Sequence, residues 1–179
     1  MKTLSSKYKE NYKGFIGDIT DAVFIKNTMK EIAKIGNIKY VINNAEKACF
    51  KNVIDYAIEE IELSLQGLKG MIICSTEALK IKEEKDIKIV NIMSSAALKG
   101  NKQESLYCAA KWGERGYTES LKTTYKKTSV KIIGVYPGGM NTAFWEKNRS
   151  YMPTTKSDTF MDPKHVAEVI LYNILNEKL

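Results

Sequence analysis

Short runs rich in Ile and Val alternate along this chain with longer segments of helical period. Uninterrupted apolar runs are typical of strands in a parallel sheet, because helices cover both faces of such a sheet. The alternation therefore predicts an α/β fold with a doubly wound parallel sheet. The predicted strands are 14–17, 39–42, 87–93 and 130–136.

Helices are predicted between and after these strands. The first, at 20–36, has Thr20 as its N-cap and Gly36 at its end, which is typical of a crossover helix. The others are expected at about 53–82 with interruptions at Gly67 and Gly70, at about 104–127, and from about 162 with Pro163 in the first turn. We find no repeat or interdomain linker, so residues 1–179 are expected to form one domain.

The composition argues against nucleic-acid and membrane partners. The net charge is +7, but the positive charges are almost all scattered lysines, and only Arg115 and Arg149 could read bases with paired hydrogen bonds. No apolar stretch approaches the ~20 residues of a membrane span, and residues 1–14 are polar and lysine-rich. We therefore expect a soluble, cytoplasmic protein.

The cysteines and the histidine exclude two other classes of protein. Cys49, Cys74 and Cys108 are odd in number and far apart, without a CxxC pair, and His165 is the single histidine. Neither a disulfide framework nor a metal site is expected. Cys108, next to Tyr107, is either a redox-sensitive thiol or a buried small side chain, and we favour the second interpretation.

Tyr107 and Lys111 stand four residues apart in the predicted helix 104–127, so they share one face of it. A phenol with its reference pKa of about 10 is a poor base at neutral pH, but a nearby ammonium favours the phenolate. The pair could therefore act as a proton donor and the cation that tunes it. Alternatively, Tyr107 packs its ring while Lys111 extends its amine to water.

Ser94 ends the predicted strand 87–93 and stands thirteen residues before Tyr107. A serine at the carboxyl end of a strand in an α/β sheet lies where ligands bind, and it could hold a substrate carbonyl while Tyr107 delivers a proton. With this serine and the YxxxK pattern after it, the sequence resembles the short-chain dehydrogenase/reductase family, whose members use a nicotinamide cofactor.

Other motifs extend the resemblance in the same order along the chain. "GDITD" at 17–21 looks like the family's aspartate motif, "VINNAEKA" at 41–48 looks like its NNAG motif, and "YPGGMNT" at 136–142 is similar to its PG motif. In the family, the NNAG motif stabilises the central sheet and lines the cofactor site. The resemblance implies that the cofactor-binding residues are Asp18, Ile19, Asn43, Ala45, Tyr107, Lys111, Pro137, Gly138, Met140 and Thr142.

The resemblance implies a Rossmann-like oxidoreductase that interconverts a small-molecule carbonyl and an alcohol with NAD or NADP. Tyr107 would be the acid in reduction and the base in oxidation. Lys111 would lower the pKa of Tyr107 and bind the nicotinamide ribose, and Ser94 would orient the carbonyl. Asp18 would contact the adenine ring with Ile19 beside it, and Thr142 would hold the nicotinamide carboxamide.

The same resemblance implies an assembly. The family commonly builds dimers and tetramers from the helices equivalent to 53–82 and 104–127, which pair across a twofold axis. We therefore expect a homodimer or a homotetramer.

The sequence departs from the family pattern near its beginning. The family's chain starts with a strand, a TGxxxGxG turn and a helix, and no such turn is present here. We expect weak dinucleotide binding without it, and a fold that is incomplete at the N-terminus. The segment 14–17 would lose its sheet neighbours, so the chain is either a fragment or has a sheet that is rebuilt or completed by another chain.

Two further departures concern the expected active site. Glu46 stands where NNAG has its final glycine, which could obstruct or repel an anionic ligand. Gly67 takes the place of the asparagine that completes the family's catalytic tetrad, and it either leaves room for a water molecule or serves close helix packing.

The remaining alternatives concern function and substrate. A catalytically impaired relative that serves as a binding or assembly module is the second hypothesis. The sequence does not decide between NAD and NADP, because the family's residues that choose between them lie at the end of its second strand, which this sequence does not contain. It does not decide the substrate, because the segment 143–161 indicates only an apolar, aromatic mouth. That mouth would be formed by Phe144, Trp145, Tyr151 and Met152, which could also be simple packing residues.

Overall fold

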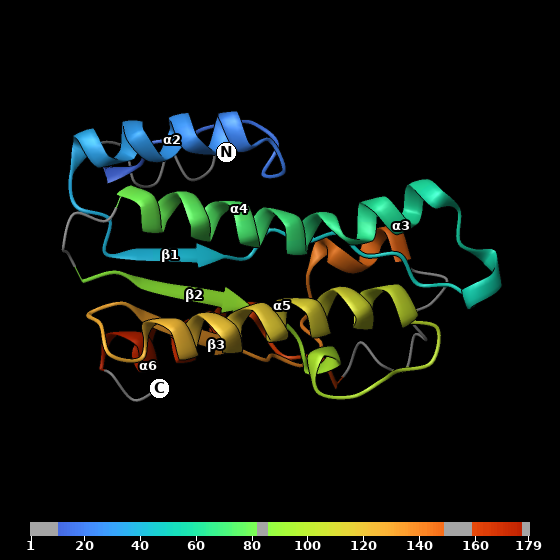
Figure 1. Cartoon of the computed structure of the whole chain (residues 1–179). Helices are drawn as coiled ribbons and strands as arrows, with labels where there is room; N and C mark the ends of the chain where they lie inside the picture. The colour runs from blue at the N-terminus through green and yellow to red at the C-terminus, as the bar shows by residue number, and fades with distance from the viewer. Residues whose placement is uncertain (1–10, 82–85, 149–158, 177–179) are drawn as a thin grey trace.

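The computed structural model describes residues 11–81, 86–148 and 159–176, and its centre is a parallel sheet (Figure 1). In the described residues the sheet has the order β1-β2-β3, with β1 at Tyr40–Asn43, β2 at Lys88–Ile92 and β3 at Lys131–Val135. Tyr40 pairs with Lys88, and Lys88 pairs with Lys131. The predicted α/β class and parallel sheet are confirmed.

Helices connect and cover these strands. They are α2 (Ala22–Ile35), α3 (Ile58–Ser64), α4 (Gln66–Ile81), α5 (Ser105–Tyr125) and α6 (Pro163–Leu175). Figure 1 shows α4 between β1 and α2, and α5 packs against both α4 and β3. Among the described residues, no helix combines the length and the apolar character needed to cross a membrane.

The main core lies between the sheet and the helices α2 and α4. Ile89 and Val90 of β2 are completely buried, as expected for the central strand. Ile25 and Met29 of α2 belong to the same buried cluster as Ile89. The apolar strand residues that predicted the sheet therefore form its core.

The predicted strand at 14–17 is wrong. These residues have no regular structure, and Ile16 is 81% exposed. An apolar run forms a strand only where a partner strand accepts its backbone hydrogen bonds, and no described strand pairs with this segment. This outcome agrees with the expectation, from the family resemblance, that the segment 14–17 lacks its sheet neighbours here.

Two predicted helix boundaries also need correction. The N-cap of α2 is Asp21, whose carboxylate accepts hydrogen bonds from the backbone N–H groups of Val23 and Phe24 at 2.8 and 3.1 Å. Thr20 instead donates its hydroxyl to Asp18 Oδ1 at 2.9 Å. Threonine and aspartate both cap helices well, so residue type alone did not distinguish Thr20 from Asp21. The predicted end at Gly36 is confirmed.

The long helix predicted at about 53–82 is divided into a 3-10 turn at Val53–Asp55, α3 and α4. The break lies at Leu65, whereas Gly67 and Gly70 are inside α4. The helices predicted at about 104–127 and from about 162 are confirmed as α5 and α6. Pro163 is in the first turn of α6, and Asp162 caps it by accepting from the Lys164 N–H at 2.9 Å.

Candidate active site

A cavity of about 950 Å3 lies at the carboxyl ends of the strands, and Ser94, Tyr107 and Lys111 all line it. Ser94 follows β2 and caps a 3-10 turn by accepting from the Ala96 N–H at 3.1 Å. Its hydroxyl also lies close enough to Tyr107 to lower the pKa of the phenol. The Lys111 ammonium lies 5.6 Å from the centre of the Tyr107 ring. The structure thus brings the three residues together from β2 and α5.

The Tyr107 ring is held by aromatic contacts. Phe50, which is buried, meets it edge to face at a centroid distance of 5.4 Å, and the Phe144 ring is 6.0 Å away. The sequence analysis did not identify Phe50, and its position seven residues after β1 carries no motif that would mark it. These contacts fix the ring plane, so the phenol oxygen has a defined direction.

The pKa of Tyr107 is raised above its ordinary value. Burial raises it, the Lys111 charge and the Ser94 hydrogen bond lower it, and the Glu46 and Glu114 charges raise it again. The expected effect of Lys111 is present, but burial outweighs it. Tyr107 is therefore protonated at neutral pH, which is the form that donates a proton.

Lys111 does not extend to water, so the alternative of a surface lysine is wrong. Its side chain is 2% exposed and pairs with the carboxylates of Glu46 and Glu114, with Nζ 2.9 Å from Glu114 Oε2. Burial lowers its pKa, but the two carboxylates and Tyr107 outweigh this effect, and the pKa is raised overall. Lys111 is therefore a buried ammonium ion.

Glu114 is a site residue that the sequence analysis missed. It lies one turn after Lys111 on α5 and is 1% exposed. Burial and the Glu46 charge raise its pKa to about 8, against the opposing effect of Lys111. The spacing of three residues from Lys111 was the available signal, but such pairs are common on exposed helix faces.

Glu46 and Gly67 fit together. The Glu46 carboxylate lies against Gly67 of α4 so closely that a Cβ atom on Gly67 would be 2.5 Å from Glu46 Oε1. The same oxygen accepts a hydrogen bond from the Lys47 N–H at 2.8 Å. The two departures from the family pattern are thus complementary, because the carboxylate occupies the space that the missing side chain leaves. Gly70 instead serves close packing, against Ile19.

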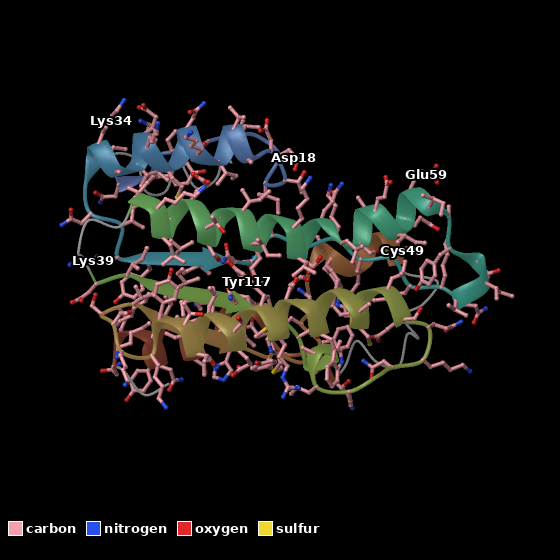
Figure 2. All side chains as sticks on the ribbon, in the orientation of Figure 1. Asp18, Lys34, Lys39, Cys49, Glu59 and Tyr117 are labelled. Carbon is pink, nitrogen blue, oxygen red and sulfur yellow. The ribbon has the colours of Figure 1, made fainter. Side chains whose placement is uncertain are left out.

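The predicted cofactor-binding residues fall into two groups. Those that line the cavity are Ala45, Tyr107, Lys111, Pro137, Gly138, Met140 and Thr142. Asp18, Ile19 and Asn43 are not among its lining residues. Figure 2 labels Asp18 just ahead of α2, where its carboxylate also accepts the Thr20 N–H at 2.7 Å.

Asn43 belongs to a polar network that ties the sheet to its helices. Its amide donates to Ser75 Oγ on α4 at 3.0 Å and to Asn91 Oδ1 on β2 at 2.8 Å. Asn91 donates in turn to Thr118 Oγ1 at 2.9 Å, and Thr118 donates to the Glu114 carbonyl at 2.7 Å. Buried polar groups in such a satisfied network hold α5 in a fixed register on the sheet.

The expected aromatic mouth is present in the residues that the structure describes. Phe144 and Trp145 line the cavity, as does Phe160. The Trp145 indole donates to the Met140 carbonyl at 2.9 Å, so this ring has a fixed place in the wall. Tyr151 and Met152 lie outside the described residues.

The cysteines do not form a reactive site. Cys108 is buried, and its Sγ is 3.8 Å from the Lys99 carbonyl oxygen. Cys49, labelled in Figure 2 in the segment between β1 and α3, has a pKa raised by burial and by Glu60. A raised pKa disfavours the reactive thiolate. Over the described ranges, we find no cluster of His, Cys, Asp and Glu that could hold a metal ion.

Comparison with known proteins identifies the class. The family model for short chain dehydrogenases matches residues 1–152. An uncharacterized oxidoreductase of Staphylococcus aureus strain N315 is 26% identical over 164 residues, which cover 90% of this chain and 69% of that relative.

Solved structures agree with this match. A short-chain dehydrogenase/reductase from Vibrio parahaemolyticus has a TM-score of 0.80 and 27% identity, covering 94% of this chain and 74% of its own. ElxO with NADP bound has a TM-score of 0.75 and 25% identity, covering 83% of this chain and 62% of its own. The chain therefore belongs to the short-chain dehydrogenase family. It is an oxidoreductase of that family, with an incomplete Rossmann-type sheet in the described residues.

Proposed function

We propose that this protein interconverts a small-molecule carbonyl and an alcohol with NAD or NADP, and that Tyr107 is the proton donor and acceptor. The observation that carries the proposal is that Ser94 and Tyr107 line one cavity together with the buried Lys111 ammonium, which lies 5.6 Å from the centre of the Tyr107 ring. A tyrosine that only packed its ring would need neither partner.

The cavity supports binding of the nicotinamide half of a dinucleotide. Its volume of about 950 Å3 is within the range of ligand sites. The segment after β1 and the segment after β3 both contribute groups to its wall. The residues proposed to hold that half are Ala45, Pro137, Gly138, Met140, Thr142 and Lys111. The cofactor, when bound, supplies the hydride in reduction and accepts it in oxidation.

In reduction, the Ser94 hydroxyl donates a hydrogen bond to the carbonyl oxygen and stabilises the negative charge that develops there. Tyr107 then gives its proton to that oxygen, and the alcohol O–H bond forms as the phenol O–H bond breaks. The Lys111 ammonium stabilises the resulting phenolate. In oxidation the same groups act in reverse, and the phenolate takes the alcohol proton.

A binding or assembly module is the second candidate, and one observation favours it. The Lys111 ammonium, which the family uses toward the nicotinamide ribose, is already paired with Glu46 and Glu114. If these pairs persist in the presence of a dinucleotide, the cofactor loses its cationic contact.

Titration of the protein with NADH and NADPH separates the two candidates. Cofactor fluorescence and calorimetry should both report saturable binding to the proposed enzyme. No association with either nucleotide up to millimolar concentration would favour the module. Turnover of a panel of aldehydes and ketones by the nucleotide that binds completes the test.

We also propose that α4 and α5 form a homodimer or homotetramer interface. The large apolar side chains exposed on them or just before them, Leu65, Ile72 and Trp112, are consistent with a covered face. Light scattering at tens of micromolar should give a multiple of the chain mass, and the mass of a single chain would contradict the proposal. The cytoplasmic location and the absence of a nucleic-acid partner stay predictions.

A further inference from the structure

Two carboxylates and one ammonium meet in the interior beside Tyr107, and their full charges do not balance. Lys111, Glu114 and Glu46 have side chains that are 2%, 1% and 13% exposed. With both carboxylates ionised, the cluster would carry one excess negative charge where little water can reach it. Such a charge is costly, so a buried group commonly takes up a proton instead.

We propose that Glu114 holds a proton in the folded protein while Glu46 and Glu114 together hold the Lys111 ammonium, so that both act as positioning residues for Lys111 and, through it, for Tyr107. The proton comes from solvent, and the Glu114 carboxylate becomes a carboxylic acid by forming an O–H bond. The cluster is then neutral overall. In the family pattern an asparagine stands at position 67, and here the Glu46 carboxylate occupies the space beside Gly67.

The surroundings of Glu114 support this assignment. The titratable groups that face the cluster are Tyr107 and Lys111 on the same helix and Glu46 on the segment after β1. From α4 the cluster meets Gly67, and from β2 the uncharged Asn91 reaches it through Thr118. Burial and the Glu46 charge and hydrogen bond raise the pKa of Glu114 to about 8, although Lys111 opposes the shift.

The carboxyl pair has a consequence for Tyr107 that rests on the proposed function. Negative charge on Glu46 and Glu114 raises the pKa of Tyr107 and so cancels part of the effect of Lys111. The phenol is kept protonated, which is the form that reduction uses.

Thermal unfolding of the cofactor-free protein tests the proton on Glu114. Because the pKa of Glu114 is raised on folding, from 4.5 to about 8, the folded chain holds a proton that the unfolded chain has lost between these values. This contribution to stability is present at low pH and is lost as pH rises through that interval. The Tm of wild type minus that of Glu114→Gln should therefore decrease as the pH is raised from about 5 to about 8.

Glu119→Gln is the matched control. Glu119 also pairs with a lysine three residues away on α5, but its side chain is 52% exposed. Its Tm difference from wild type should stay nearly flat over the same range. A flat difference for Glu114→Gln as well would overturn the proposal, because Glu114 would then be ionised throughout.

Glu46→Gln supplies a second route if Glu114→Gln does not fold. Without the Glu46 charge, Glu114 can stay ionised beside Lys111. The Tm of Glu46→Gln should therefore decrease less between about pH 5 and pH 8 than the Tm of wild type does. An unchanged slope in Glu46→Gln would contradict the proposal that the Glu46 charge keeps the proton on Glu114.

Ultraviolet titration of the phenolate tests the effect on Tyr107. The difference between each protein and its Tyr107→Phe counterpart isolates this one tyrosine. The Tyr107 midpoint in Glu46→Gln should move down by about one pH unit, the size of effect that a neighbouring charge produces. No movement, or an upward one, would overturn the positioning role. Both readouts need no cofactor, so loss of the proposed activity and loss of this inference are distinguishable.

Discussion

Two turns of α5 carry the same kind of ion pair in different surroundings. Lys111 and Glu114 are three residues apart, as are Glu119 and Lys122, and the N–O distance is 2.9 Å in both. The first pair is almost completely buried, whereas the side chains of the second are 52% and 39% exposed. The exposed pair contributes only about 0.3–0.5 kcal/mol to stability, because water screens it. Two ion pairs with the same spacing and N–O distance can therefore differ in their contribution to stability and to the site.

The packing of α5 explains the difference. Lys111, Glu114 and Thr118 lie on one side of the helix because they are spaced by three and four residues. Thr118 on this side is tied to Asn91 of the sheet. The pair on this side shares its lysine with Glu46, so its charge state affects Tyr107.

The largest expected effect is that of Tyr107→Phe on turnover. The ring and its packing stay, but the proton that the site transfers is lost. General acid catalysis contributes typically ~10²–10⁴-fold, so kcat should fall by about that factor. Steady-state kinetics with matched thermal melts measure it.

Tyr117→Phe is the control for this substitution. Tyr117 lies on the same helix, is labelled in Figure 2, and packs against the buried cluster of Met71, Met93 and Ala97. Its turnover should be nearly unchanged. Equal activity of Tyr107→Phe and wild type would return Tyr107 to a packing role and refute the catalytic assignment.

Lys111→Met has the next largest effect, on stability as well as on activity. Removing one partner of a buried ion pair costs about 3–5 kcal/mol, because the remaining charge is uncompensated. The loss should grow with pH, since Glu114 loses its proton as the pH rises through about 8 and then leaves a buried negative charge beside Glu46. The pH optimum for oxidation should also move upward, because the phenolate loses its neighbouring cation.

Lys122→Met sharpens the comparison between the two turns. It removes the lysine of the exposed pair, so the free energy of unfolding should change by less than about 0.5 kcal/mol at any pH. Denaturant unfolding at pH 6 and pH 9 measures both variants. A similar loss of unfolding free energy for Lys111→Met and Lys122→Met would show that burial does not make the first pair more important for stability than the second.

The sequence was sufficient for features that local pattern determines. The Ile and Val runs of β2 and β3 predicted strands correctly, because a central strand is buried on both faces. The run at 14–17 failed since a strand also needs a neighbour, which local pattern does not report. The spacing of Ser94, Tyr107 and Lys111 was informative because a strand end and one turn of helix fix their relative positions.

The charge state of the site could not be predicted from the sequence. Glu46 and Gly67 are far apart along the chain, and their complementarity exists only after α4 packs beside the segment that follows β1. Glu114 has the same spacing from a lysine as Glu119, so only tertiary packing shows which of the two is buried. The Glu46 side chain fills the space beside Gly67, so the two departures from the family pattern form a single packing contact.

The last prediction tests that complementarity directly. Gly67→Asn introduces a Cβ atom 2.5 Å from Glu46 Oε1, so the carboxylate must move. Overpacking of this kind typically costs ~1–3 kcal/mol. In a Glu46→Gly background the space is free, and the same substitution should cost much less. The double variant should therefore be more stable than the sum of the single changes by about 0.5–3 kcal/mol.

Gly116→Asn controls for the helix propensity of asparagine, because a Cβ atom at Gly116 of α5 would meet nothing within 4 Å. Urea unfolding at neutral pH should show no coupling between Gly116→Asn and Glu46→Gly. Coupling at position 67 but not at position 116 would tie Glu46 to the space beside α4. Additive effects at position 67 would mean that the carboxylate moves aside without cost, and the buried pair on α5 would then not depend on Glu46 for its place.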